Sequence, residues 1–217
     1  MISRTRDGKP ITAYTPTMKY VIEHMEDGFL EWVILEYLQI IREVGKDNLI
    51  LLSLPQGTEV PQQLKDLGLQ WTSDECVSFM EDKNRVCLLD PAAETDLEPL
   101  DADKFDYFVF GGILGSHPRI DRTGILRRKY GFAGRRLGAL QMTTDTAVRV
   151  TQKIVEDKTK FEDIKFLDYP EIRYNKYEST EMPFRYVVDA NNEPILPEGM
   201  LKLIEKDAEQ SIDDLLA

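Results

Sequence analysis

The sequence has few of the residues that build metal and disulfide sites, with two cysteines and two histidines among 217 residues. Cys76 and Cys87 lie in different apolar stretches, and together with His24 and His117 they do not have the spacing of zinc ligands. We therefore expect no metal site. Two thiols and no signal peptide are typical of a reducing compartment, so we expect a cytoplasmic protein.

Long apolar runs and an excess of positive charge are missing as well. The longest apolar runs, such as LILLSL at 49–54, are far too short to span a bilayer, so no membrane partner is expected. Acidic residues outnumber basic ones by 39 to 27, which gives a net charge of −12. Such a chain does not coat nucleic acid by general electrostatics and would attract a basic partner. The alternative is that the acidity only keeps the protein soluble.

The known phosphate-binding glycine motifs are also missing. The stretch FGGILGSHPRIDRT at 110–123 follows the apolar run FDYFVF. Its glycines, Gly111, Gly112 and Gly115, do not give G-x-G-x-x-G, and no Gly-Lys-Ser/Thr follows them. A dinucleotide fingerprint and a P-loop are thus excluded here. Glycines still allow a close backbone approach, which suits an adenosine met edge-on by amides and carbonyls.

Strand and helix patterns alternate along most of the chain. The expected strands cover 18–25, 48–54, 85–91 and 105–110, and the expected helices cover 29–45, 61–68 and 143–157. The first and last of these helices have apolar residues at helical spacing, and the strands are short apolar runs. This alternation predicts an α/β fold with a mainly parallel sheet and helices on both faces.

The two ends of the chain have a different character. Residues 1–17 lack periodicity and are predicted to be a disordered N-terminal extension, or an upstream start before a natural one at Met18. Residues 18–190 are the expected folded domain, and 191–217 are an acidic C-terminal segment with a short helix at 198–206. The acidic segment is either a solvated surface or a lid over a site for a cationic substrate.

Three loops rich in glycine and small polar residues follow buried strands. They are LPQGT at 54–58, GGILGSHP at 111–118, and RRLGALQMTTDT at 135–146. Ligands of α/β folds bind at the carboxyl ends of the strands. We therefore expect the ligand site where these loops meet.

These loops resemble, in the same order, those of the SPOUT class of S-adenosylmethionine-dependent methyltransferases. Four stretches resemble one branch of that class more closely, the SPOUT protein arginine methyltransferase of fungi and its archaeal and eukaryotic relatives. They are KYVIEHMEDGFLEWVILEY, VCLLDP, FVFGGILG with the following HP and DRT, and RRLGALQMTTDTA. Ser116 departs from the branch, where Asp is expected, so no catalytic role is assigned to it.

The resemblance implies a SPOUT fold with a C-terminal trefoil knot, and S-adenosylmethionine bound by the three loops. It also implies that the substrate is an arginine of a small-subunit ribosomal protein, and it favours a monomer over a homodimer. The residues it assigns to the cofactor are Leu54, Pro55, Gly57, Phe110, Gly111, Gly112, Ile113, Gly115, Leu137, Leu140, Met142 and Thr143.

Methyl transfer to arginine requires carboxylates near the glycine turn, because a protonated guanidinium is a poor nucleophile and must be oriented while it loses a proton. The predicted catalytic residues are Asp121, Arg122, Glu23 and Asp145, and Glu26 and Asp90 are further candidate acids. Two of these have a structural alternative. For Asp145 the alternative is that it does no more than cap its helix. For Asp90, which precedes a proline, the alternative is that it does no more than shape a turn.

Seven basic residues lie between 119 and 136. They could form a solvated face, pair internally with the surplus acids, or contact RNA. Three functions remain open at this point. The first is a protein arginine methyltransferase, the second is a SPOUT RNA methyltransferase acting on rRNA or tRNA through these bases, and the third is an inactive adaptor that binds a basic partner.

Overall fold

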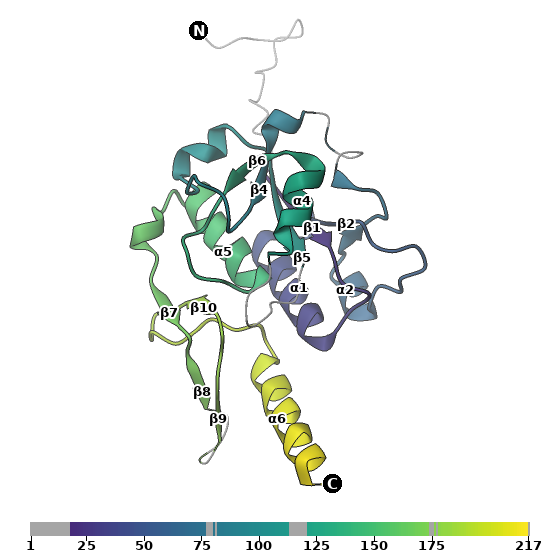
Figure 1. Ribbon diagram of the computed structural model, residues 1–217, viewed down its shortest axis with the longest axis vertical. Helices are drawn as coiled ribbons and strands as arrows, with labels where there is room; N and C mark the ends of the chain where they lie inside the picture. The colour runs from purple at the N-terminus through teal and green to yellow at the C-terminus, as the bar shows by residue number, and fades with distance from the viewer. Residues whose placement is uncertain are drawn as a thin grey trace, which may run out of the picture.

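The protein is built around one six-stranded parallel sheet (Figure 1). The computed structural model describes residues 18–76, 80, 82–112, 121–173, 176 and 178–216, with side chains of the last helix described up to 208. The strands are β1 (Lys19–His24), β2 (Leu49–Leu52), β3 (Gln70–Trp71), β4 (Val86–Leu89), β5 (Tyr107–Gly112) and β6 (Ala133–Arg135). Their order is β3-β2-β1-β5-β4-β6, and every neighbouring pair is parallel. The predicted parallel sheet is confirmed.

Helices cover both faces of this sheet, as the alternation predicted. On one face, α1 (Glu31–Val44), α2 (Gln62–Asp66) and α5 (Thr144–Val155) pack on strand residues such as Tyr20 and Ile22. On the other face, α4 (Thr123–Tyr130) packs on residues such as Val21. The central strands are buried on both faces, which explains why their sequences are apolar throughout rather than alternating.

Several short elements gave no clear signal in the sequence. The strand β6 is the tripeptide AGR, which has no alternation of apolar and polar residues. The helix α4 has the sequence TGILRRKY and ends at Gly131, whose φ of 66° is the left-handed conformation that favours glycine. The described part of the chain also contains 3-10 turns at Lys83–Arg85, Pro99–Asp103 and Phe161–Asp163.

The C-terminal part of the chain forms a two-part hairpin arm followed by a helix. Strand β7 (Phe166–Asp168) pairs with β10 (Arg185–Val187), and β8 (Glu171–Arg173) pairs with β9 (Ser179–Glu181). The helix α6 (Met200–Leu216) is longer than the expected helix at 198–206. The arm and α6 both extend away from the main sheet (Figure 1). The strands were missed because each has three residues and the segment has little periodicity.

This C-terminal part has its own apolar core, which rests on α1. Phe184 and Tyr186 of the arm and Leu203 of α6 pack with Trp32 and Leu35 of α1. It is therefore joined to the sheet domain through the same helix that covers the sheet.

The structure does not test the expectations for the N-terminal extension, the knot and the division of the chain at 190. Residues 1–17 lie outside the described part of the chain. The trefoil knot and the division of the chain at 190 stay predictions. Within the described residues, no helix combines the length and apolar character needed to cross a membrane.

Candidate functional site

A pocket opens at the carboxyl ends of β4 and β5, between the first turns of α4 and α5. This is the edge of the sheet where α/β folds bind their ligands. The residues that line it are Leu89, Asp90 and Pro91 after β4, Phe110 and Gly111 in β5, Asp121, Arg122 and Thr123 at the start of α4, and Leu137, Gly138, Leu140, Gln141, Met142, Thr143, Thr144 and Ala147 from the third loop and α5.

The walls of the pocket suit a flat ring with a short polar tail. Leu89, Phe110 and Leu137 supply apolar surface, and most residues of the loop at 137–143 contribute to the wall. The first turn of α5 adds backbone N–H groups that have no partner within the helix. Gly138 lets the loop turn, because its φ is 72° and a Cβ there would lie 2.7 Å from the ring of Phe161. The donor chemistry fits a nucleoside such as that of S-adenosylmethionine.

The mouth of the pocket is acidic and held by arginines. Asp90 and Asp121 both contact the guanidinium of Arg127, and Arg122 donates to Glu26 at 2.7 Å and to the carbonyl of Met25 at 3.1 Å. The side chain of Asp90 is 2% exposed, whereas that of Asp121 is 47% exposed. Two predicted catalytic residues, Asp121 and Arg122, therefore lie together at the pocket.

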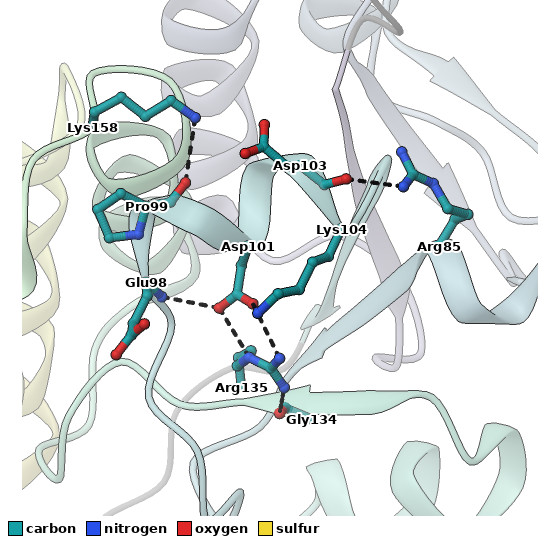
Figure 2. A network of polar contacts seen from close by, with 9 residues as sticks. All are labelled: Arg85, Glu98, Pro99, Asp101, Asp103, Lys104, Gly134, Arg135 and Lys158. Carbon is teal, nitrogen blue, oxygen red and sulfur yellow. Dashed lines mark hydrogen bonds and ion pairs between the residues drawn. The ribbon is translucent and has the colours of Figure 1, made fainter.

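The third loop begins at β6, which is anchored by a buried ion pair (Figure 2). Arg135 donates from Nε and Nη2 to the two oxygens of Asp101, at 2.9 and 3.0 Å. Lys104 and the backbone N–H of Glu98 also donate to Asp101. Burial alone would raise the pKa of Asp101, but these hydrogen bonds outweigh it and lower that pKa. The start of the loop is thereby fixed to the turn at Pro99–Asp103.

Behind the third loop, buried charges connect α5 to α1. Asp145 is fully buried and faces Arg149 at 3.5 Å, while Arg149 also donates to Glu43 at 2.6 Å. Burial raises the pKa of Asp145 despite Arg149. Burial and the nearby Asp145 raise the pKa of Glu36 to about 8. Asp145 is not among the lining residues although Thr144 and Ala147 are. A catalytic role for Asp145 does not fit this position.

Glu23 also lies away from the pocket. Its register partner in β5 is Gly111, but its side chain points to the sheet face covered by α4. There it accepts hydrogen bonds from Ser53 at 2.6 Å, from Cys76 at 3.0 Å and from the hydroxyl of Tyr130. The predicted catalytic role of Glu23 does not fit this placement, because three side-chain donors already hold the carboxylate.

The predicted cofactor residues divide into three groups. Those that line the pocket are Phe110, Gly111, Leu137, Leu140, Met142 and Thr143. Those that lie outside the described residues are Ile113 and Gly115. Those that are described but do not line the pocket are Leu54, Pro55, Gly57 and Gly112.

The strand order and the core packing explain why the residues of the last group do not line the pocket. The loop at 54–58 follows β2, which β1 separates from β5, and Leu54 is buried in the apolar core. At Gly112 a Cβ would meet the hydroxyl of Tyr37 and would lie 2.7 Å from Cγ2 of Ile22, so this glycine serves core packing. Leu89 and Pro91 are lining residues that the sequence did not assign to the site, and Asp90, expected as a candidate acid, lines the pocket beside them. Their signal was the Asp-Pro that ends the buried strand VCLLDP.

The basic segment at 119–136 pairs largely within the protein. Five of its seven bases have acidic partners: Arg122 with Glu26, Arg127 with Asp90 and Asp121, Lys129 with Glu75, Arg135 with Asp101, and Arg136 with Asp96. Arg128 is exposed, and Arg119 lies outside the described residues. Of the three alternatives, internal pairing with the surplus acids describes this segment.

Comparison with known proteins gives a consistent result. The family described as "Protein arginine N-methyltransferase SFM1-like" matches residues 19–211. Protein arginine N-methyltransferase SFM1 of Saccharomyces cerevisiae is 61% identical over 212 residues, which cover 92% of this chain and 100% of the yeast protein. The crystal structure of the yeast arginine methyltransferase SFM1 complexed with SAM is 60% identical and has a TM-score of 0.84, covering 88% of this chain and 91% of that chain.

A more distant structure, that of spTrm10 in complex with SAH, is 13% identical with a TM-score of 0.53, and it covers 67% of this chain and 91% of its own. It shares the fold alone, and these likenesses confirm the SPOUT fold class. On the family match and the identity to the yeast protein, the chain belongs to the SFM1-like family of protein arginine N-methyltransferases.

Proposed function

We propose that this protein transfers a methyl group from S-adenosylmethionine to an arginine side chain of a basic small-subunit ribosomal protein, as a monomer in the cytoplasm. The observation that carries the proposal is the pocket itself. A cleft with apolar walls at Leu89, Phe110 and Leu137 is lined also by Asp121 and Arg122. The cofactor and the acceptor therefore have adjacent places in one site.

S-adenosylmethionine supplies a methyl group on a sulfonium when bound. A guanidinium nitrogen of the substrate forms the new C–N bond as the C–S bond breaks, and the nitrogen then gives up one proton. Holding the two reactants in line can supply about 7–11 kcal/mol of the barrier. The walls at Phe110, Leu137 and Met142 would hold the cofactor for this alignment.

Asp121 is the residue best placed to orient the acceptor. It is half-exposed at the mouth, lines the pocket and is held by Arg127 and the N–H of Gly124. Its carboxylate would hold the plane of the guanidinium and receive the proton that leaves as the bond forms. Arg122, bound to Glu26, would fix the neighbouring wall and meet an anionic part of the cofactor, its carboxylate.

The charge distribution supports a basic protein as the acceptor rather than RNA. The chain carries a net charge of −12, which favours association with a cationic protein. Five bases of the segment at 119–136 are engaged with internal acids, so they offer little net positive charge to a phosphate backbone. The C-terminal part covers Trp32 and Leu35 of α1 within the same chain, which supports a monomer.

The test is a labelling experiment with three acceptors in parallel. Radiolabelled S-adenosylmethionine is incubated with the enzyme and either purified small-subunit ribosomal proteins, rRNA or tRNA. We expect label in protein, on arginine by amino-acid analysis, at a rate that falls as salt rises. A double variant, Arg128→Met with Lys129→Met, should leave this rate within about threefold, since neither residue lines the pocket. Label in RNA, lost in that double variant, would overturn the proposal in favour of the RNA enzyme.

A further inference from the structure

At the pocket mouth, the guanidinium of Arg127 on α4 bridges the carboxylates of Asp90 and Asp121. Its Nη2 donates to Oδ1 of Asp90 at 2.8 Å, and its Nε donates to the other oxygen of the same carboxylate. Asp90 also accepts the N–H of Ala92 at 2.9 Å, and its side chain is 2% exposed. The guanidinium is therefore bound in a two-point, planar contact to a carboxylate that cannot move far.

The far side of the same guanidinium reaches Asp121. Nη1 of Arg127 lies 3.2 Å from Oδ2 of Asp121, and Nη2 lies 3.4 Å from Oδ1. Asp121 also accepts the N–H of Gly124 at 2.9 Å. This close approach requires a glycine at position 124, because a Cβ there would lie 2.8 Å from Oδ2 of Asp121. Asp121 is thus held from one side while 47% of its side chain stays exposed.

We infer that Arg127 is a positioning residue, which uses buried Asp90 as its anchor to hold the Asp121 carboxylate in the orientation that receives the substrate guanidinium. The inference rests on the proposed function. Asp90 and Asp121 line the pocket, whereas Arg127 is not among the lining residues. Arg127 would therefore act through Asp121 and not on the substrate itself.

The charges at the mouth agree with this role. Two carboxylates and one guanidinium leave a net charge of −1, which a substrate guanidinium would neutralise. Hydrogen bonds to Asp90, then to Asp121, raise the pKa of Arg127, so it remains charged. The longer contacts to Asp121 leave oxygen lone pairs on its exposed side for a second guanidinium. A lysine could not span both acids, because an ammonium is a point charge without the planar fork.

A purely structural role for Arg127 makes a different prediction. An ion pair that only joins α4 to the end of β4 would affect stability, and its loss would reduce activity independently of Asp121. A positioning role requires that the loss depends on Asp121. The two roles can be separated by combining variants, because residues that act as one unit give non-additive effects.

The experiment is a double-mutant cycle with Asp121→Asn, Arg127→Met and the two combined, using labelled S-adenosylmethionine and purified small-subunit ribosomal proteins. The turnover, the KM for protein, the cofactor Kd by calorimetry and the melting temperature are measured for each. Arg127→Lys replaces Arg127→Met in the cycle if the latter does not fold. Arg128→Met is the matched control, because Arg128 is the next residue of α4, is exposed and does not line the pocket.

We expect Arg127→Met to lower turnover about 10-fold or more and the combined variant to match Asp121→Asn within about threefold. The cofactor Kd should change less than about threefold, and Arg128→Met should behave as wild type. Additive losses in the combined variant, or normal turnover of the Arg127→Met enzyme, would overturn the inference about Arg127. The proposed function would still stand in either case, because the wild-type enzyme would be active. A folded wild type that binds cofactor and labels no protein would overturn both.

Discussion

The loops that follow β2 and β4 leave the same edge of the sheet, and both come after a buried apolar strand that is closed by a proline. They differ in what surrounds them. The loop after β4 lies between β5 and β6 in the strand order and meets the first turns of α4 and α5, where Leu89, Asp90 and Pro91 line the pocket. The loop at 54–58 lies beside β3 and β1, with Leu54 buried in the core.

The difference shows that the end of a strand is not sufficient to make a site. The strand order changes direction between β1 and β5, and the pocket lies on the side of that point where two helices begin. Only a loop on that side also faces the third loop, which is fixed by the Arg135–Asp101 pair (Figure 2).

The largest effect is expected from removing the anchor of the third loop. Asp101→Ala leaves Arg135 unpaired with 14% of its side chain exposed, which should cost about 3–5 kcal/mol of unfolding free energy. The exposed neighbouring pair is the control, because Asp96→Ala should cost about 0–1 kcal/mol. Denaturant unfolding measures both. Equal losses would show that burial does not distinguish the two pairs.

The same pair predicts a pH dependence. The pKa of Asp101 is lowered in the folded protein, so its contribution is present above the ordinary aspartate pKa and is lost as pH falls through the folded value. The difference in unfolding free energy between wild type and Asp101→Asn should therefore shrink at acid pH. A difference that grows as pH falls would contradict the ion pair.

The next effect concerns catalysis at the mouth. Asp121→Asn keeps the size of the side chain and removes its charge, so turnover should fall about 100-fold while the cofactor Kd stays near wild type. Single-turnover labelling and calorimetry give the two quantities. Normal turnover would move the acceptor-binding role to another acid, and Asp90 would be the first to test because it also lines the pocket.

A smaller effect is expected at Gly112. Because a Cβ at this position would press on Tyr37 and Ile22, Gly112→Ala should cost about 1–3 kcal/mol of stability through overpacking. This replaces the expectation that Gly112 makes room for the cofactor. Thermal unfolding tests it, and a variant of normal stability with lost cofactor binding would restore the earlier interpretation.

The smallest effect belongs to the loop after β2. Gly57 has a φ of 86° with no atom near its Cβ position, so Gly57→Ala should cost only about 1–2 kcal/mol through backbone strain. The cofactor Kd should not change, because no residue of this loop lines the pocket. A tenfold weaker Kd would show that this loop reaches the cofactor after all.

The sequence was informative wherever local pattern decides structure. Buried strands are apolar on both faces and α1 and α5 have clear periodicity, so the parallel sheet and its helices could be predicted. The order of the strands depends on how they pack, which no local pattern records. This is why the loop at 54–58 was assigned to the site and the loop after β4 was not.

The partners of the arginines could not be read from the sequence for the same reason. Arg127 and Asp90 are 37 positions apart, and Arg135 and Asp101 are 34 apart. The charge surplus suggested that acids and bases would pair internally, but not which ones. The hairpin arm was missed because three-residue strands carry too little pattern.

Calorimetric titration of Ala147→Phe decides whether the pocket between β4, β5 and α5 binds S-adenosylmethionine. Ala147 lines the pocket from α5, and a phenyl ring there would occupy the space assigned to the cofactor. We predict that wild type and Gly57→Ala bind with similar Kd, and that Ala147→Phe, still folded by thermal unfolding, binds at least about 100-fold more weakly. Undiminished affinity in a folded Ala147→Phe protein would place the cofactor outside this pocket.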